Sequence, residues 1–317
     1  MSLTDYVGIL GRGPGRSRSL TFEEARDTMA NMLSGEAAPE AVGAVLMLLR
    51  MKGETAEEIA GFASAAQMSL PIMPPADLDW SSYAAGRSRG RPWFLLSARL
   101  VADAGYRVLL HGSNGGDTTV RDALPAAGIA VADGYDSLAN ALDRDRICYA
   151  PLESLHPALF ALLDLRHVLG LRSCLNTVCR MLNPGGAGAS VQGVFHPSYR
   201  ELQADAATIL GWSSLTIIKG GGGEFERLPT KMIAGFGLRG GKPWNGGYEP
   251  SLFAHLRLAD TVSAATIENV WSGRSVDPLA TEIIVGTAAA ALDTLGERDT
   301  TKRALALWQT RRDRLAA

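Results

Sequence analysis

The chain has 317 residues, of which 46% are hydrophobic and 20% are charged, and its formal net charge is −2. Such a composition can bury one large core or two smaller ones, and it is not the composition of a disordered protein. The nearly neutral charge argues against a protein that coats nucleic acid through its overall charge, although a local basic face is compatible with it. The three cysteines, Cys148, Cys174 and Cys179, cannot all pair, and no spacing suggests zinc. With neither a secretion signal nor a long apolar span, we expect buried free thiols, no membrane partner and a cytoplasmic location.

Residues 1–75 predict a small helical domain. The sequences TFEE at 21–24 and TAEE at 55–58 are capping boxes, in which the Thr and the last Glu satisfy each other's backbone amides and start a helix. Between them a helix over 39–51 begins with Pro39 in its first turn and stops at a Lys-Gly pair. Prolines after residue 70 end the third helix.

After residue 80, short apolar segments alternate with helical ones. We expect strands at 106–110, 148–150, 191–195, 215–218 and 232–236. We expect helices at 93–104, 156–169, 173–182, 199–210, 261–271, 278–295 and 300–315. This alternation predicts a parallel sheet with helices on both faces. The predicted fold is α/β: a small N-terminal α-helical domain, and over 76–317 a large α/β domain with a central, mostly parallel sheet flanked by helices. We expect some C-terminal helices to pack on the helical domain.

Three loops precede helices, where parallel sheets bind their ligands. In the first, Arg87, Arg89 and Arg91 stand before a predicted helix, and helix N-termini and guanidinium groups both bind phosphate. The second, HGSNGGDTT at 111–119, begins with His111 and Gly112 and lets a ligand approach its backbone closely. A solvated basic turn and a purely structural turn are the respective alternatives.

The third loop, KGGGGEFER, runs from Lys219 to Arg227. Four consecutive glycines cost backbone entropy and are hard to explain by packing. Glu224 and Glu226 are candidate ligands for a hard cation such as Mg²⁺, and they are equally able to pair with Arg227. A further cluster of candidates contains a histidine at a helix start, where structural roles are common, and no spacing indicates a catalytic triad.

Several segments, in this order, resemble the anthranilate phosphoribosyltransferase family, relatives of the pyrimidine nucleoside phosphorylases. They are LRMKGETAEEIAG at 49–61, YAP at 149–151, HPA at 156–158, RHVLGLR at 166–172, LN at 175–176, LNP at 182–184 and QGVFHP at 192–197. The resemblance covers about residues 20–295. It implies dimerisation through the α-domain and a substrate-side pocket formed by Pro151, His156, Arg166 and Asn176.

The chain departs from this family at the catalytic loops. The family's GTGGD loop, which binds phosphoribosyl diphosphate, corresponds to AGRSR at 85–89, and its KHGN corresponds to LHGS at 110–113. The family's NxST corresponds to LLSA at 95–98, and its metal-holding Asp-Glu pair corresponds to Phe225-Glu226. Ribosyl transfer needs Mg²⁺ and several donors to stabilise the departing diphosphate, so these losses predict an eroded site.

A branch of the family outside the tryptophan pathway resembles the chain more closely, through its arginine-bearing loop, its His-Gly loop and its KGGxGExER run. Members of that branch are implicated in low-specificity nucleic-acid binding as homodimers. The resemblance therefore implies a retained fold with a changed function, in which Arg87, Arg89, Arg91, His111, Gly112, Lys219 and Arg227 bind phosphates.

Two alternatives stay open. One is an active glycosyl- or phosphoribosyltransferase that uses phosphoribosyl diphosphate and Mg²⁺ with an altered acceptor. The other is a cleft that binds a phosphorylated small molecule for regulation. No cofactor is certain in any of the three cases.

Overall fold

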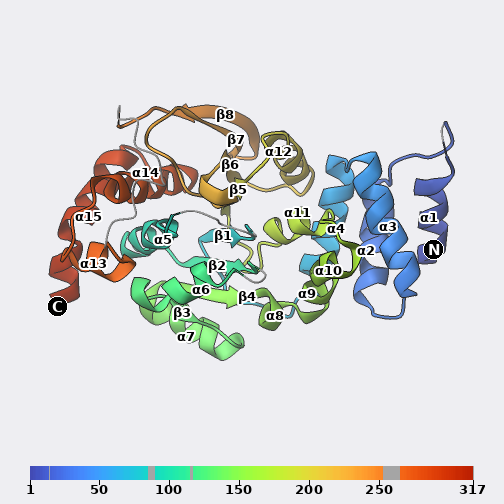
Figure 1. Cartoon of the computed structure of the whole chain (residues 1–317), viewed down its shortest axis with the longest axis horizontal. Coiled ribbons are helices and arrows are strands. Elements are labelled where there is room, and N and C mark those ends of the chain that lie inside the picture. Colours follow the sequence, from blue (N-terminus) through green and yellow to red (C-terminus); the bar gives the residue numbers. More distant parts are fainter. Residues whose placement is uncertain (14, 85–89, 115–116, 253–264, 317) are drawn as a thin grey trace.

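The computed structural model describes residues 1–13, 15–84, 90–114, 117–252 and 265–316. Figure 1 shows an elongated molecule, with the N-terminal helices at one end, the sheet in the middle and the C-terminal helices at the other end. This agrees with the predicted fold: a helical N-terminal unit followed by a large α/β unit.

The helical unit consists of α1 (Leu3–Gly11), α2 (Phe22–Leu33), α3 (Pro39–Lys52) and α4 (Ala56–Met68). Both predicted capping boxes are present, at the starts of α2 and α4. The carboxylate of Glu58 is fully buried, and it accepts hydrogen bonds from Leu20 N at 2.9 Å and from Lys52 Nζ at 2.8 Å. Helix α1, which buries Leu3, Tyr6 and Leu10, was not predicted.

The strands form one eight-stranded sheet in the order β3-β4-β2-β1-β5-β6-β7-β8. They are β1 (Leu78–Ser82), β2 (Val108–Gly112), β3 (Ala130–Val131), β4 (Ile147–Pro151), β5 (Ala189–Val194), β6 (Ser214–Lys219), β7 (Ile233–Arg239) and β8 (Lys242–Tyr248). The first six strands in this order are parallel to one another. Strand β7 runs antiparallel to β6, and β8 runs antiparallel to β7. All five predicted strands are present.

The sequence did not predict β1, β3 or β8. Strand β1 lies in the centre of the sheet, although its sequence, LDWSS, is largely polar. Asp79 is acceptable there because it accepts a hydrogen bond from Ser190 on β5 at 2.7 Å. A search for apolar segments misses a buried strand whose polar side chains, such as Asp79 and Ser82, bond to residues far away in the sequence. Strand β8 contains Pro243 and two glycines, which suit an edge strand, and β3 has only two residues.

Helices cover both faces of the sheet. The remaining elements are α5 (Phe94–Asp103), α6 (Thr119–Ala123), η1 (Pro125–Ala127), α7 (Tyr135–Asp145), α8 (Leu152–Leu155), α9 (Pro157–Asp164), α10 (Arg166–Leu169), α11 (Leu175–Arg180), α12 (Tyr199–Ile209), η2 (Gly221–Gly223), α13 (Ile267–Ser272), α14 (Pro278–Thr294) and α15 (Thr300–Ala316). Helices α5 and α14 share one apolar cluster with the sheet, whereas α11 and α12 belong to a second cluster that includes the helical unit. The predicted helix 156–169 is divided into α9 and α10, and α7 was not predicted.

We expected some C-terminal helices to pack on the helical unit, but the main contacts of the described helices α13, α14 and α15 lie elsewhere. Helix α14 packs against α5 and α15, at the end of the molecule opposite the N-terminus (Figure 1). Side chains on almost every face of α14 are buried. Such a helix is stable only where apolar neighbours surround it, as they do beside the sheet. Of the predicted helix 261–271, residues 261–264 lie outside the described residues, and helix begins at Ile267.

The three cysteines are buried and unpaired, as predicted. Within the described ranges, no helix has the length and apolar character that crossing a bilayer requires.

Candidate functional site

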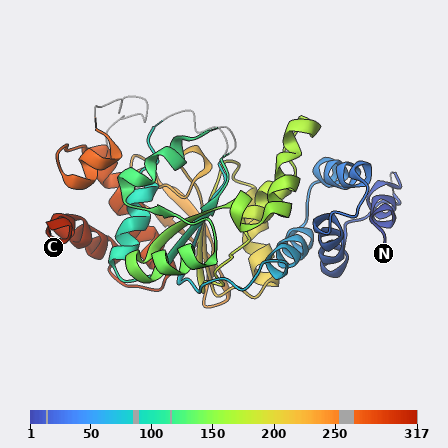
Figure 2. The same cartoon turned by 90° about the horizontal axis from the view of Figure 1, so that it is seen from below.

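Strands β1, β2, β4, β5 and β6 are parallel, so their carboxyl ends meet at one edge of the sheet, where the predicted binding loops also lie. Figure 2 shows the segment of α9 and α10 standing beside this edge, between the sheet and the helical unit. Any site shared by the two units is therefore formed here.

The glycine run after β6 folds the chain tightly onto β5. A Cβ atom at Gly193 would lie 2.0 Å from the carbonyl carbon of Glu224, and one at Gly220 would lie 1.7 Å from its carbonyl oxygen. Gly222 and Gly223 have φ values of 65° and 89°, which other residues rarely adopt. Close packing thus does explain the glycines, contrary to the prediction, and their role is to place Glu224.

Glu224 joins three loops. Its side chain is 1% exposed, and Oε1 accepts hydrogen bonds from Ser82 Oγ at 3.0 Å, Ala84 N at 3.2 Å and Asn114 Nδ2 at 3.2 Å. These donors follow β1 and β2, whereas Glu224 follows β6. The carboxylate is therefore a structural acceptor at the edge of the sheet.

Glu226 has a similar structural role at a different place. Its Oε2 accepts a hydrogen bond from Phe94 N, at the first residue of α5, at 3.0 Å. We predicted a phosphate site before α5, but the buried carboxylate of Glu226 already lies at the start of that helix. Between the two glutamates, the ring of Phe225 packs edge-on against Trp80 at 5.4 Å in the core.

Glu224 and Glu226 do not form a shared divalent-cation site in the described residues. Glu224 and Glu226 take their hydrogen bonds from different elements, and no group of three or more His, Cys, Asp or Glu in the described part of the chain is arranged to hold a metal. The structure does not support the prediction that these two carboxylates bind Mg²⁺ together.

Arg227 does not contribute to a phosphate-binding surface, contrary to the prediction. It is 8% exposed, donates to the carbonyl oxygen of Glu249 and lies over the ring of Tyr248 at 5.8 Å. Burial lowers the pKa of its guanidinium group. It forms no ion pair with Glu224 or Glu226, so that alternative is also wrong.

His111 and Gly112 are part of the sheet. The His111 ring is fully buried, with Nδ1 2.7 Å from the Tyr83 hydroxyl and Nε2 3.0 Å from Asp79 Oδ1, although the latter contact is poorly aligned for a hydrogen bond. A Cβ atom at Gly112 would lie 2.0 Å from the Ser82 carbonyl oxygen. The alternative of a structural turn therefore describes these two residues, and they do not face a ligand.

The other predicted phosphate-binding residues remain at the surface. Lys219 is exposed at the end of β6, and Arg91 is exposed before α5. Arg87 and Arg89 lie outside the described residues.

The four predicted substrate-side residues do not converge. Pro151 ends β4 and is buried. His156 caps α9 by accepting from Leu159 N at 3.3 Å, and its Nε2 lies 2.8 Å from Ser69 Oγ of the helical unit. Burial lowers the pKa of His156, which is consistent with a neutral ring that holds the two units together. Arg166 and Asn176 line two separate pockets.

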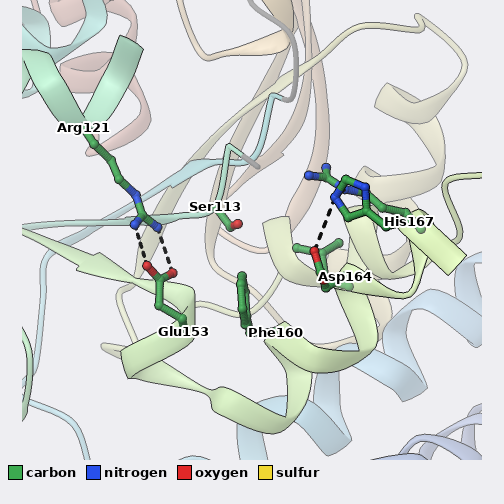
Figure 3. A pocket seen from close by; sticks show the side chains of 8 residues that line it. Ser113, Arg121, Glu153, Phe160, Asp164 and His167 are labelled. Atoms are coloured by element: carbon green, nitrogen blue, oxygen red, sulfur yellow. Dashed lines mark hydrogen bonds and ion pairs between the residues drawn. The ribbon is translucent and has the colours of Figure 1, made fainter. Parts of the chain in front are cut away.

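Arg166 lines a pocket of about 300 Å³ beside α9, together with Ser113, Arg121, Glu153, Phe160, Leu163, Asp164 and His167. Figure 3 shows its charges arranged in pairs. Arg121 and Glu153 approach to 2.5 Å, and His167 lies 3.4 Å from Asp164. Most of its charge is therefore neutralised from within the protein.

Asn176 lines a second pocket, of about 260 Å³, between α3 of the helical unit and the end of β5. Its lining residues are Arg50, Gly170, Leu171, Arg172, Ser173, Asn176, Thr177, Arg180, Val194, Phe195, His196, Tyr199 and Gln203. These include three arginines and a histidine but neither Asp nor Glu. We call this the cationic pocket. All the charged side chains that line it are basic.

Arg180 forms the floor of the cationic pocket. It is 8% exposed, and its guanidinium donates to the carbonyl oxygens of Gly193 at 3.0 Å and Tyr83 at 3.2 Å and to Asn176 Oδ1 at 2.5 Å. Burial lowers the pKa of Arg180, and the nearby charge of Glu224 opposes this effect. All its hydrogen-bond partners are neutral, so an anion in the pocket would meet a positive charge that is only partly balanced.

Two further arginines close the pocket toward the helical unit. Arg50 on α3 donates to the carbonyl oxygen of Arg172 at 2.6 Å, so a ligand here would contact both units. Sequence reasoning assigned no role to Arg50 or Arg180, and it named Arg172 only as a member of a candidate cluster with His156 and Arg166. Arg172 and Phe195 lie within segments that carried the family resemblance, and Arg180 is a lone charge in the otherwise uncharged run CLNTVCRML at 174–182, which was a detectable signal.

Comparisons with known proteins agree with this architecture. A family model described as glycosyl transferase family, helical bundle domain, matches residues 5–69, and one described as glycosyl transferase family, a/b domain, matches residues 95–311. An anthranilate phosphoribosyltransferase of Agrobacterium fabrum is 30% identical over 301 residues, which cover 91% of this chain and 87% of the relative. One of Methanocorpusculum labreanum is 30% identical over 88% of this chain and 85% of the relative.

Solved structures show the same fold. The anthranilate phosphoribosyltransferase of Thermus thermophilus aligns with a TM-score of 0.80 at 22% identity, over 98% of this chain and 95% of that one. The Saccharomyces cerevisiae enzyme in complex with PRPP and Mg aligns with a TM-score of 0.80 at 16% identity, over 98% and 93% of the two chains.

Proposed function

The chain belongs to the glycosyl transferase family that combines a helical bundle domain with an a/b domain, and on this premise we propose that it binds nucleic acid with low sequence specificity instead of transferring a phosphoribosyl group. The observation that carries this proposal is the cationic pocket, in which every charged lining group is basic. Phosphate contacts made by such groups carry no sequence information, so the expected preference for sequence is weak.

The carboxylates at the edge of the sheet support the same proposal. Phosphoribosyl transfer requires a cation that neutralises the diphosphate, and the two glutamates that were candidates to hold it are engaged with protein donors. A phosphate-binding protein needs no such cation. The exposed Lys219 and Arg91 lie at the same edge and would extend the basic surface beyond the pocket.

The first test is fluorescence anisotropy of the full chain with labelled single-stranded DNA, single-stranded RNA and duplex DNA in rising salt. We expect binding at low salt. The logarithm of the association constant should fall steeply and linearly with the logarithm of the salt concentration. Absence of binding to all three at low salt would contradict the proposal. A cytoplasmic location remains a prediction.

A second candidate function is a phosphoribosyltransferase with an altered acceptor. It is favoured by the 30% identity to anthranilate phosphoribosyltransferases over most of the chain. Calorimetry with phosphoribosyl diphosphate and Mg²⁺ tests it. Binding of phosphoribosyl diphosphate that depends on Mg²⁺ would favour the enzyme over the nucleic-acid-binding protein.

We also propose that the chain acts as a homodimer formed through its helical unit. Met51 and Met68 are 83% and 72% exposed on α3 and α4, and Ile72, which follows α4, is 89% exposed. An interface that covered these side chains would remove apolar surface from water. Sedimentation velocity of the wild type and of Met68→Lys tests this: we expect a dimer that the substitution weakens.

A further inference from the structure

Phe195 presents an exposed aromatic ring at the cationic pocket. It follows β5, lines the pocket and is 63% exposed. The neighbouring His196 ring contacts it edge-on, with centroids 5.1 Å apart, and so supports it from one side. An aromatic face beside guanidinium groups suits a planar ring that carries a negative charge.

Gln203 supplies a second, independent observation. It projects from α12, lines the same pocket and is 1% exposed, and its Oε1 has no hydrogen-bond partner in the described part of the protein. Buried amide oxygens are nearly always satisfied, so an isolated one at a pocket wall indicates a ligand that brings an N–H group. The pocket therefore offers a stacking face, an acceptor and three guanidinium groups within one cavity.

We propose that the cationic pocket receives one unstacked nucleotide of a single strand. In this arrangement its base stacks on Phe195 and donates an N–H to Gln203, and its phosphate lies against Arg172 and Arg50. This inference rests on the proposed function and sharpens it, because it predicts a preference for single strands. A duplex keeps its bases stacked and paired, so it cannot place one in a pocket of about 260 Å³.

The charge of the pocket favours a nucleotide over a small aromatic carboxylate. A monocarboxylate brings one negative charge, whereas Arg50, Arg172, Arg180 and His196 offer several positive groups. A separate pocket beside α9 is lined by Arg166, a further cation that a longer strand could contact. A polymer of phosphates matches this row of cations better than a single small anion does.

The experiment measures the affinity of the full chain for a labelled single-stranded oligothymidylate and for a hairpin duplex. In Phe195→Ala we expect single-strand affinity to fall about 10-fold, because stacking on one aromatic ring contributes roughly that much per base. Phe195→Trp should restore it, and duplex affinity should be unchanged in both. Val168→Ala is the matched control, since Val168 is an exposed apolar residue on α10 that does not line the pocket.

Each contrary outcome is informative. If the wild type binds strands but Phe195→Ala binds single strands equally well, the inference fails while the proposed function stands. An equal loss on single strand and duplex also overturns the inference, because stacking would then not be the cause. If the wild type binds no strand at low salt, both fail. Calorimetry with 2-aminobenzoate completes the test. If 2-aminobenzoate binds the wild type but not Arg172→Gln, and if Phe195→Ala leaves single-strand affinity unchanged, the pocket binds a small carboxylate instead.

Discussion

The carboxylate edge and the cationic pocket both contain buried charge, but they balance it differently. At the edge, Glu224 and Glu226 receive hydrogen bonds from backbone amides and polar side chains of this same chain. In the pocket, Arg180 has only carbonyl and amide oxygens as hydrogen-bond partners, and no carboxylate lines the cavity. A charge that is satisfied internally holds the fold together, whereas a charge with only neutral partners is available to a ligand. This difference is the basis for proposing the pocket as the functional region, although the sequence pointed first to the loops.

The largest expected effect is on the carboxylate edge. Glu224→Ala leaves Ser82 Oγ, Ala84 N and Asn114 Nδ2 without their shared acceptor. We expect it to lower the free energy of unfolding by about 2–4 kcal/mol, since each donor loses a charge-assisted bond in a buried site. Urea unfolding measures this. Glu224→Gln, which keeps an acceptor oxygen, should cost less, and a loss below about 0.5 kcal/mol in the alanine variant would mean that the edge does not hold the loops.

The second prediction concerns a substitution that would neutralise the charge of Arg180 within the protein, as the charges at the carboxylate edge already are. Asn176→Asp places a carboxylate 2.5 Å from Arg180 Nη1, at the present position of the amide oxygen. We expect single-strand affinity to fall about 10-fold, because the guanidinium becomes internally balanced and the new charge repels phosphate. We expect folding stability to change by about 1 kcal/mol or less, in the stabilising direction. Fluorescence anisotropy measures the affinity and urea unfolding measures the stability of the same preparation. An unchanged single-strand affinity would contradict the idea that the charge of Arg180 is available to a ligand.

The third prediction removes one cation from the rim. Arg172→Gln should weaken strand binding about 5-fold and lower the slope of log affinity against log salt by about 0.7 per lost phosphate contact. Stability should hardly change, because Arg172 is exposed. Arg144→Gln is the matched control, because Arg144 is an exposed arginine on α7 that is paired with Asp145 away from the pocket. Equal effects of both variants would indicate a nonspecific charge effect.

The smallest effect concerns an exposed ion pair that resembles neither region. The hydrogen bond from Arg18 lowers the pKa of Glu24 to about 2 from an ordinary value of 4.5. Because the folded pKa is depressed, this pair stabilises the protein above about pH 4.5 and loses that contribution as the pH falls toward 2. The contribution should be below about 1 kcal/mol, since the Arg18 side chain is 53% exposed to solvent. Urea midpoints across the acid range should depend less on pH in Glu24→Gln, and an identical pH dependence would contradict the prediction.

The fold was predictable where local pattern determines structure. The capping boxes at Thr21 and Thr55 and the apolar strands β2, β4, β5, β6 and β7 follow from spacing and side-chain type alone. Strand β1 was not predictable in this way, because Asp79 is acceptable in a central strand only when Ser190, 111 residues later, donates to it. Polar core positions depend on tertiary partners that a local pattern does not contain.

The site was less predictable for the same reason. The sequence pointed to Glu224 at the end of a strand, but the hydrogen bond from Ala84 N, 140 residues earlier, decides that this carboxylate is structural. Asn176 lines a pocket, but His156 and Arg166, with which the sequence grouped it, lie elsewhere. The cationic pocket gathers α3, α11, α12 and the end of β5, and only the packing of the two units brings these elements together.

The ring of Phe225 makes the divergence of this chain hard to reverse. The resemblance places a metal-holding Asp of the family at this position, but Phe225 is fully buried against Trp80. Restoring Asp would put a charge into the apolar core, while the neighbouring Glu226 would still be needed at the start of α5. The substitution Phe225→Asp would therefore cost folding stability before it could supply a second carboxylate at this edge.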